Sequence, residues 1–261
     1  MGSAYYSFCE ELWRDWLADR LELPAFIRAE FDTGSAPEPW LPFGAGHSPL
    51  VALTTNPGAS MPHQLRATIL AGRSVVRPEM CYAEAAAALA TFYEAELTGP
   101  ARRRIAALEH LAMRAGYDGV VQVECCPFHS GRLPKKEALV RLIEAGGLLG
   151  TYVAQLRDFI ATRPVIVVSA VSSRAPLSPE SLRLSPWLAW QVYLMGLDLS
   201  RAELVPLVWK REATTSAALV DRGAPVPRAL VLMMGGNHLP GETGLRRLAA
   251  ALAPAGAQHA G

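Results

Sequence analysis

The sequence has almost no net charge, few cysteines and no long apolar run. Its 261 residues include 25 Lys and Arg against 24 Asp and Glu, which gives a formal net charge of +1. This balance argues against a polyanion-binding surface spread over the whole protein, but it leaves room for a local basic patch. Hydrophobic residues make up 51% of the chain and charged residues 19%, which is typical of a globular protein rather than a disordered one.

The cysteines are too few and too scattered for a disulfide framework. They are Cys9, Cys81, Cys125 and Cys126. The longest apolar stretches, VIVVSAV and ALVLMMGG, are far shorter than the roughly 20 residues that a membrane-spanning helix needs. The first residues lead into an amphipathic, charged segment, CEELWRDWLADRL, rather than an apolar leader. We therefore expect a monomeric protein in the reducing cytoplasm, without a membrane partner.

Apolar runs of strand length alternate with helical patterns along the chain. Strands are predicted over residues 50–55, 119–125, 164–171, 205–211 and 228–236. Helices are predicted over residues 4–20, 83–97, 100–116, 134–147, 150–163, 178–196 (in two pieces divided at Pro186) and 241–252. The strands lack polar alternation, which is typical of a parallel sheet covered by helices on both faces. The sequence therefore predicts a three-layer α/β/α sandwich.

The same pattern suggests one domain. We expect a single α/β domain over residues 46–253, because no internal repeat and no second core are recognisable. Residues 1–45 are expected to form a helix and a Pro/Gly-rich connector packed on this domain. The small, polar residues 254–261 are expected to form a flexible tail.

Ligands of parallel sheets bind beyond the carboxyl ends of the strands, and three of the predicted strand ends carry unusual residues. The first strand leads into Asn56-Pro57-Gly58, where proline and glycine together favour a sharp turn. An isolated Asn-Pro-Gly is most often only a turn, but here two other polar strand ends accompany it.

The second strand end reads VECCPFHSGRLP, and its cysteines do not form a convincing metal site. Adjacent strand residues point to opposite faces, so Cys125 and Cys126 do not easily share an ion, and no second ligand pair follows. A thiol nucleophile based on His129 lacks an identifiable orienting group. Buried, structural thiols are the favoured interpretation, and no metal and no cofactor are expected.

Glu124 is a stronger candidate than the thiols. A carboxylate at the last position of an apolar strand either caps a turn or faces a pocket, because buried charges need partners. Arg132 and Lys135 then flank the start of the next predicted helix, a place that suits a phosphate. The alternative is a solvated helix start.

The third strand end is Gly235-Gly236-Asn237-His238-Leu239-Pro240-Gly241. The paired glycines let the backbone approach another group closely. A single histidine is more often structural than catalytic, but the position of His238 after a buried strand favours a functional role.

Together these three ends resemble the uracil-DNA glycosylase superfamily, over roughly residues 49–252. ALTTNPG is similar to the first family motif, VECCP to a second that reads H-N-Y-C-P in one branch, Arg132-Leu133-Pro134 to an R-x-P element, and NHLPG to the last motif. The resemblance implies a mainly parallel four-stranded central sheet and hydrolysis of the N-glycosidic bond of a flipped or single-stranded DNA base.

The resemblance also implies roles for individual residues. Asn56 would position the attacking water, and His238 would contact the base carbonyl where negative charge develops, with Asn237 as its competitor. Pro57 and Gly58 would shape the pocket, and Glu124 would read the base. The DNA backbone would contact the residues Arg132, Lys135, Gly236 and Gly241.

Glu124 stands where these relatives carry an asparagine that reads uracil. An ionised carboxylate only accepts hydrogen bonds, so it would favour a base with an exocyclic amine over plain uracil. Two alternatives stay open. The chain lacks an aromatic residue over residues 57–81 and the serine of the last motif, which favours a non-catalytic member that binds nucleic acid or a nucleotide. A hydrolase of free nucleosides or esters is the other.

Overall fold

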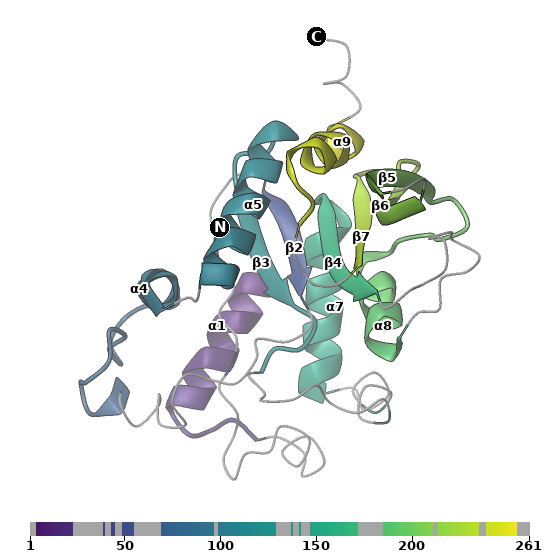
Figure 1. Cartoon of the computed structure of the whole chain (residues 1–261). Coiled ribbons are helices and arrows are strands. Elements are labelled where there is room, and N and C mark those ends of the chain that lie inside the picture. The colour runs from purple at the N-terminus through teal and green to yellow at the C-terminus, as the bar shows by residue number, and fades with distance from the viewer. Residues whose placement is uncertain are drawn as a thin grey trace. The chain divides into compact units, whose positions relative to one another are not determined.

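The computed structural model describes residues 4–22, 39, 43–44, 49–54, 69–96, 99–128, 137, 141, 147–171, 185–210, 213–234 and 239–254. Its helices are α1 (Ala4–Leu17), α4 (Tyr82–Glu96), α5 (Gly99–Arg114), α7 (Gly147–Ala161), α8 (Pro186–Met195) and α9 (Glu242–Leu252). Its strands are β1 (Phe43–Gly44), β2 (Leu50–Thr54), β3 (Val120–Glu124), β4 (Val165–Val171), β5 (Glu203–Lys210), β6 (Ala213–Asp221) and β7 (Arg228–Met234) (Figure 1).

The predicted elements that fall in these ranges are present, with ends shifted by a few residues. Pro186 begins α8, the second of the two predicted pieces, and Ser185 caps this end by accepting a hydrogen bond from the backbone N–H of Leu188 at 3.2 Å. Most of the helix predicted over residues 134–147 and the first piece of the one over 178–196 lie outside the described residues.

The chain divides into two compact units. One unit comprises Met1–Phe43, Thr55–Leu97 and Glu124–Phe159, and it contains α1, α4 and most of α7; we call it the helical unit. The other comprises Gly44–Thr54, Thr98–Val123 and Ile160–Gly261, and it contains nearly all of the sheet with α5, α8 and α9; we call it the sheet unit. The single domain expected over residues 46–253 stays a prediction.

The sheet has the strand order β1-β3-β2-β4-β7-β6-β5. β2 pairs with β4, and β4 with β7, in parallel. Hydrogen bonds at both ends of β2 show that β3 runs in the same direction. The N–H of Leu50 donates to the carbonyl of Gly119 at 2.9 Å, and Oγ1 of Thr54 donates to the carbonyl of Val123 at 3.2 Å. The strands β3, β2, β4 and β7 are therefore parallel.

The sheet is larger than the four strands expected from the sequence, and it is mixed. β6 pairs in antiparallel fashion with both β5 and β7. The sequence of β6, ATTSAALVD, contains alanines and small polar residues instead of a long β-branched run, so its strand propensity is weak. Burial decides its conformation, since Ala217, Ala218, Leu219 and Val220 are all fully buried.

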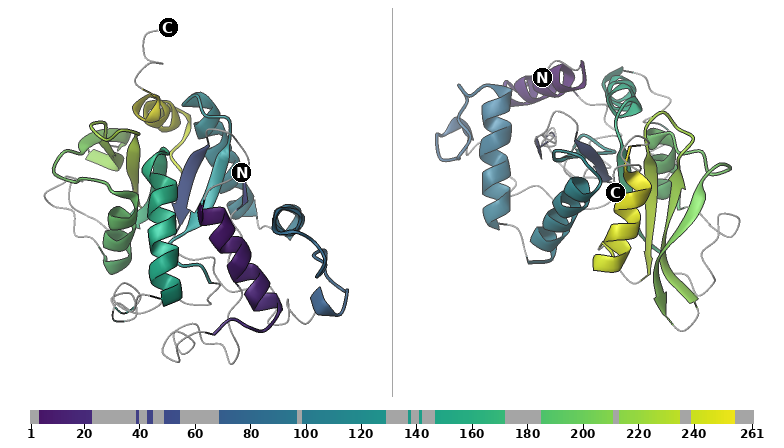
Figure 2. Two further views of the ribbon diagram at one scale, coloured as in Figure 1. Left: turned by 180° about the vertical axis from the view of Figure 1, so that it is seen from behind. Right: turned by 90° about the horizontal axis from the view of Figure 1, so that it is seen from above.

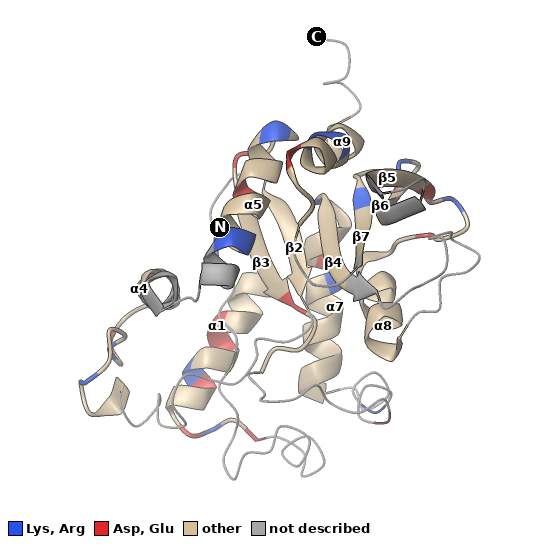
Figure 3. Cartoon of the chain, in the orientation of Figure 1, with Lys and Arg blue, Asp and Glu red and all other residues tan. Residues whose placement is uncertain are grey.

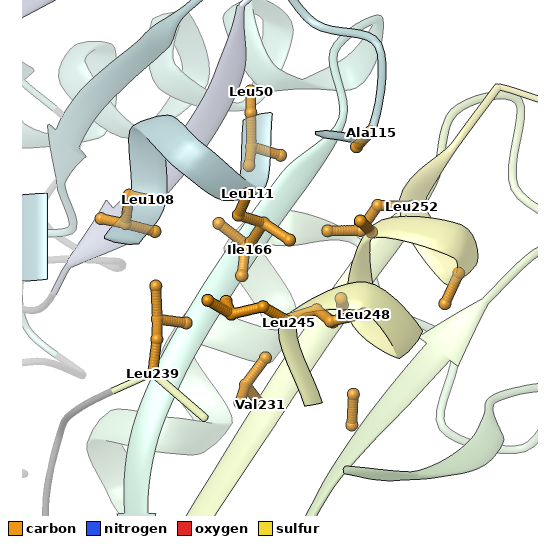
Figure 4. Packing of buried hydrophobic residues seen from close by; sticks show 14 of the residues in the cluster. Leu50, Leu108, Leu111, Ala115, Ile166, Val231, Leu239, Leu245, Leu248 and Leu252 are labelled. Atoms are coloured by element: carbon orange, nitrogen blue, oxygen red, sulfur yellow. The ribbon is translucent and has the colours of Figure 1, made fainter. Parts of the chain in front are cut away.

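The core of the sheet unit lies between the sheet and the helices α5 and α9. Leu111 of α5 and Leu248 of α9 belong to one buried cluster with Ile166 of β4 and Val231 of β7 (Figure 4). The alternate strand residues are buried as well. They include Val51, Val165, Val167 and Leu230.

On the other face of this sheet, α8 packs on β2 and β4 (Figure 2). Both faces of β2 and β4 are therefore covered, as the missing polar alternation predicts. Within the described residues, no helix combines the length and apolar character needed to cross a membrane.

Candidate functional site

Two of the predicted site residues, Glu124 and Gly241, belong to the part of the chain that the structure describes. The others lie outside the described residues, and their roles stay predictions. They are Asn56, Pro57, Gly58, Arg132, Lys135, Gly236, Asn237 and His238.

The strands that precede these motifs end at one edge of the sheet. β2, which leads toward Asn56, and β7, which leads toward His238, are both parallel to β4 and flank it. Neighbouring strands are about 4.8 Å apart, so the ends of β2 and β7 are separated laterally by about 10 Å.

The pairing register aligns the two strands. Val51 pairs with Val165, which pairs with Arg228, so Thr54 stands level with Val231.

Polar contacts hold the β2 side of this edge. Thr54 bonds to the carbonyl of Val123, as described above. Nε2 of Gln191, a buried residue of α8, lies 3.5 Å from the carbonyl oxygen of Leu53, which is a long hydrogen bond. Sequence reasoning missed Gln191; its signal is a single amide within the otherwise apolar PWLAWQVYLM.

Glu124 is the last residue of β3, and it is only 1% exposed. Carboxylates are seldom this deeply buried, because transfer of the charge out of water is unfavourable. The hydroxyl of Tyr152 donates a hydrogen bond to the backbone carbonyl of Glu124 at 2.6 Å. A buried carboxylate at the carboxyl end of a parallel strand is a typical functional-site group.

Hydroxyls and thiols surround this end of β3 in the helical unit. We define the tyrosine–cysteine cluster as the residues Tyr5, Cys9, Tyr82, Cys126 and Tyr152. All of them are at most 8% exposed. The hydroxyls of Tyr5 and Tyr152 are 3.3 Å apart. Helices α1, α4 and α7 each contribute to the cluster, so it joins segments that are far apart in the sequence.

Burial keeps the groups of this cluster protonated. Desolvation raises the pKa of Cys9 and that of Cys126 from 9.0 to about 12, and the charge of Glu124 adds to the shift of Cys126. Desolvation is also the main cause that raises the pKa of Tyr5 and of Tyr152 well above 10.0. A thiol with a raised pKa is a poor nucleophile at neutral pH. The prediction that both thiols are buried is confirmed, since Cys126 is 1% and Cys125 4% exposed.

Gly241 is the N-cap of α9, and nothing in its geometry requires glycine. Its φ of −64° is accessible to every residue, and a Cβ placed there meets no atom within 4 Å. The next residue is Glu242, whose carboxylate bonds to Arg114 at 2.5 Å and to Arg246 at 3.1 Å. Figure 3 shows blue, basic segments on both α5 and α9. The carboxylate of Glu242 opposes an anion at this helix start.

Other possible sites in the described residues do not coincide with the motifs. No group of three or more His, Cys, Asp or Glu side chains among those residues is arranged to hold a metal ion. An open pocket of the sheet unit is lined by residues that include Tyr117, Pro164, Arg222 and Pro227. Pro164 and Pro227 precede β4 and β7, so this pocket lies at the amino edge of the parallel strands, opposite to the edge where such sheets bind ligands.

Comparisons with known proteins do not supply an identity for this arrangement. No protein-family model matches the chain, and neither a curated protein nor a solved structure matches it.

Proposed function

We propose that the chain is a DNA glycosylase-type hydrolase of the kind that the uracil-DNA glycosylase superfamily represents, acting on a flipped or single-stranded base other than plain uracil. The observation that carries this proposal is the buried carboxylate of Glu124 at the carboxyl end of β3. β3 lies beside β2, the strand that leads into Asn56-Pro57-Gly58. DNA is the proposed partner, and no cofactor is required.

The proposed reaction needs stabilisation of two opposite charges. Cleavage of the glycosidic bond produces positive charge on the sugar and negative charge on the departing base. Asn56 would hold the attacking water near the sugar, and His238 would donate a hydrogen bond to the base carbonyl, with Asn237 as the competing donor. The base would have to leave the stack, or be single-stranded, to reach these groups.

Glu124 would determine which base is accepted. As an ionised acceptor it would repel the O4 carbonyl of uracil and would accept a hydrogen bond from an exocyclic amine, as on cytosine. Burial makes this discrimination stronger, because an unmatched polar group in a desolvated site has no water to replace the lost partner. The proposed substrate is therefore an amino-bearing or modified base.

Base release from a panel of oligonucleotides tests this proposal. Single- and double-stranded substrates would carry uracil, cytosine or modified amino-bearing pyrimidines at one position. We expect the wild-type protein to release an amino-bearing base, and Asn56→Ala to lower that rate by about 100-fold or more, as loss of a key polar group does in other enzymes. Glu124→Asn should shift the preference toward uracil.

Each other outcome has a definite meaning. Release of uracil by the wild-type protein at the rate of Glu124→Asn would contradict the assigned specificity. Binding of the oligonucleotides without base release by either wild-type or Asn56→Ala protein would favour the non-catalytic alternative. Turnover of free nucleosides, with none of oligonucleotides, would favour a small-molecule hydrolase.

A further inference from the structure

The hydrogen bonds around Tyr152 have a direction that the chemistry of their atoms determines. A backbone carbonyl only accepts, so the hydroxyl hydrogen of Tyr152 is used in the 2.6 Å bond to Glu124. The oxygen of Tyr152 is then left as an acceptor for the hydroxyl of Tyr5, 3.3 Å away. The result is a directed chain from Tyr5 through Tyr152 to the carbonyl of Glu124.

Burial affects the titration of both phenols. Desolvation is the main cause that raises the pKa of Tyr5 and of Tyr152. Because both pKa values stay well above 10.0, both phenols keep their protons at neutral pH. The series of hydrogen bonds from Tyr5 through Tyr152 to Glu124 is therefore intact at the neutral pH of an ordinary assay.

Aromatic packing in the helical unit holds the first member of this chain in place. The ring of Tyr5 lies 4.8 Å from that of Phe159, centroid to centroid, and the ring of Tyr6 lies 5.4 Å from Phe159 at nearly a right angle. Both contacts connect α1 to α7, the helix that carries Tyr152. Such ring pairs strengthen packing beyond simple burial and limit the positions that Tyr5 can take.

We infer that Tyr152 and Tyr5 are positioning residues for base selectivity, because they anchor the backbone of Glu124 at the end of β3. The inference rests on the proposed function, in which Glu124 reads the base. It also assigns a role to α1, because this helix carries Tyr5, the first donor in the series of hydrogen bonds. A carboxylate on an unanchored strand end would discriminate less well, because selectivity depends on a fixed hydrogen-bond geometry.

Tyr152→Phe is the test variant, and Tyr117→Phe is its matched control. Tyr117 is also buried, and its hydroxyl also donates to a backbone carbonyl at 2.6 Å, that of Leu252 in the sheet unit. Tyr117→Phe removes the same kind of bond at a place with no role in the inference. A loss of stability common to both variants therefore cannot explain a difference in selectivity between them.

Two measurements test separately whether Tyr152 fixes the end of β3 and whether this affects the selectivity between bases. Amide hydrogen exchange, read by mass spectrometry over residues 120–128, should become at least several-fold faster in Tyr152→Phe and stay at the wild-type rate in Tyr117→Phe. The selectivity, measured as the ratio of kcat/KM for the preferred amino-bearing base to that for uracil, should fall about tenfold in Tyr152→Phe. Tyr5→Phe should give a smaller fall in the same direction. If the protein binds without releasing bases, the ratio of Kd values for cytosine- and uracil-containing oligonucleotides replaces kcat/KM.

Failure of this inference differs from failure of the proposed function. A wild-type protein that discriminates between bases, and that keeps its selectivity in Tyr152→Phe, would overturn the positioning role alone. Unchanged exchange over residues 120–128 would overturn the anchor itself. A wild-type protein that neither releases nor binds any base would overturn the proposed function and the selectivity role together, whatever the exchange rates.

Discussion

The sheet unit and the helical unit bury interiors of different chemistry. The cluster between α5, α9 and the sheet consists almost entirely of aliphatic side chains, such as Leu50, Ile166 and Leu252. The interior of the helical unit instead gathers phenols, thiols and the end of β3 with Glu124. The first interior contains few side chains that can form hydrogen bonds, whereas the second contains hydroxyls, thiols and a carboxylate.

Buried charges in the sheet unit have evident structural partners. Arg228 donates hydrogen bonds to the carbonyls of Ala161 and Arg163, at 3.0 and 3.2 Å, and so caps the carboxyl end of α7. Asp221 pairs with Arg201 at 3.1 Å. These residues stabilise helix and strand ends.

Alkaline pH should give the largest difference between the two units, because it weakens the interior of the helical unit. Both thiols of the tyrosine–cysteine cluster have their pKa raised from 9.0 to about 12, so the unfolded chain loses these protons at lower pH than the folded one. Their contribution to stability is fully present below pH 9 and is lost as the pH rises to 12. The loss is about 4 kcal/mol at most for each thiol, from about 1.4 kcal/mol per pH unit.

Denaturant unfolding under reducing conditions at several pH values between 8 and 12 measures this effect. Cys126→Ala should give a shallower fall of the unfolding free energy, by up to about 1.4 kcal/mol per pH unit. Cys81→Ala is the control, because Cys81 is exposed. Equal slopes for the two variants would show that Cys126 is not held in its protonated form.

Truncation in the aliphatic interior should give the next largest change. Leu111 of α5 is 0% exposed, whereas Met113, two residues later on the same helix, is 67% exposed. Leu111→Ala should lower the unfolding free energy by about 2–5 kcal/mol, through lost burial and the cavity it leaves. Met113→Ala should change it by less than about 0.5 kcal/mol. Similar losses in the two variants, measured by urea unfolding, would contradict the assigned orientation of α5.

Replacing a glycine by alanine in one helix of each unit should change the stability of the protein in opposite directions. A Cβ on Gly244 of α9 would lie 2.6 Å from Cβ of Pro240 and 3.1 Å from the carbonyl oxygen of Leu207, so Gly244→Ala should destabilise by about 1–3 kcal/mol. A Cβ on Gly150 of α7 meets no atom within 4 Å. Gly150→Ala should therefore stabilise by about 0.5–1 kcal/mol. Thermal unfolding of both variants checks the two signs, and a more stable Gly244→Ala protein would refute the close packing of α9.

The parallel part of the fold was predictable because each strand is a self-contained apolar run. β4 and β7, for example, lie within two residues of their predicted ends. β6 was missed because its alanines have little strand propensity and its polar residues interrupt any apolar run, so that its place between β5 and β7 makes it a strand. The local sequence pattern therefore predicted the strands that are apolar over most of their length.

The candidate site was predictable only in part. The sequence singled out Glu124, because a carboxylate at the end of an apolar run is unusual in itself. The partners of its backbone could not be predicted, since Tyr5 and Tyr152 are separated by 147 positions and each has an ordinary place on its helix. Sequence patterns show which face of a helix is buried, but they do not show which hydroxyl meets which carbonyl.

The last strand of the sheet has a consequence for how the protein behaves at high concentration. β5 lies at the end of the strand order, where an open edge can recruit strands from other molecules. Its Pro206 lacks an N–H, and its pairing with β6 is irregular on either side of Val208. The carbonyl of Pro206 already accepts a hydrogen bond from Arg247 at 3.2 Å. β5 is thus a poor template for edge-to-edge aggregation, and the fold keeps a mixed sheet without exposing a regular ladder at this edge.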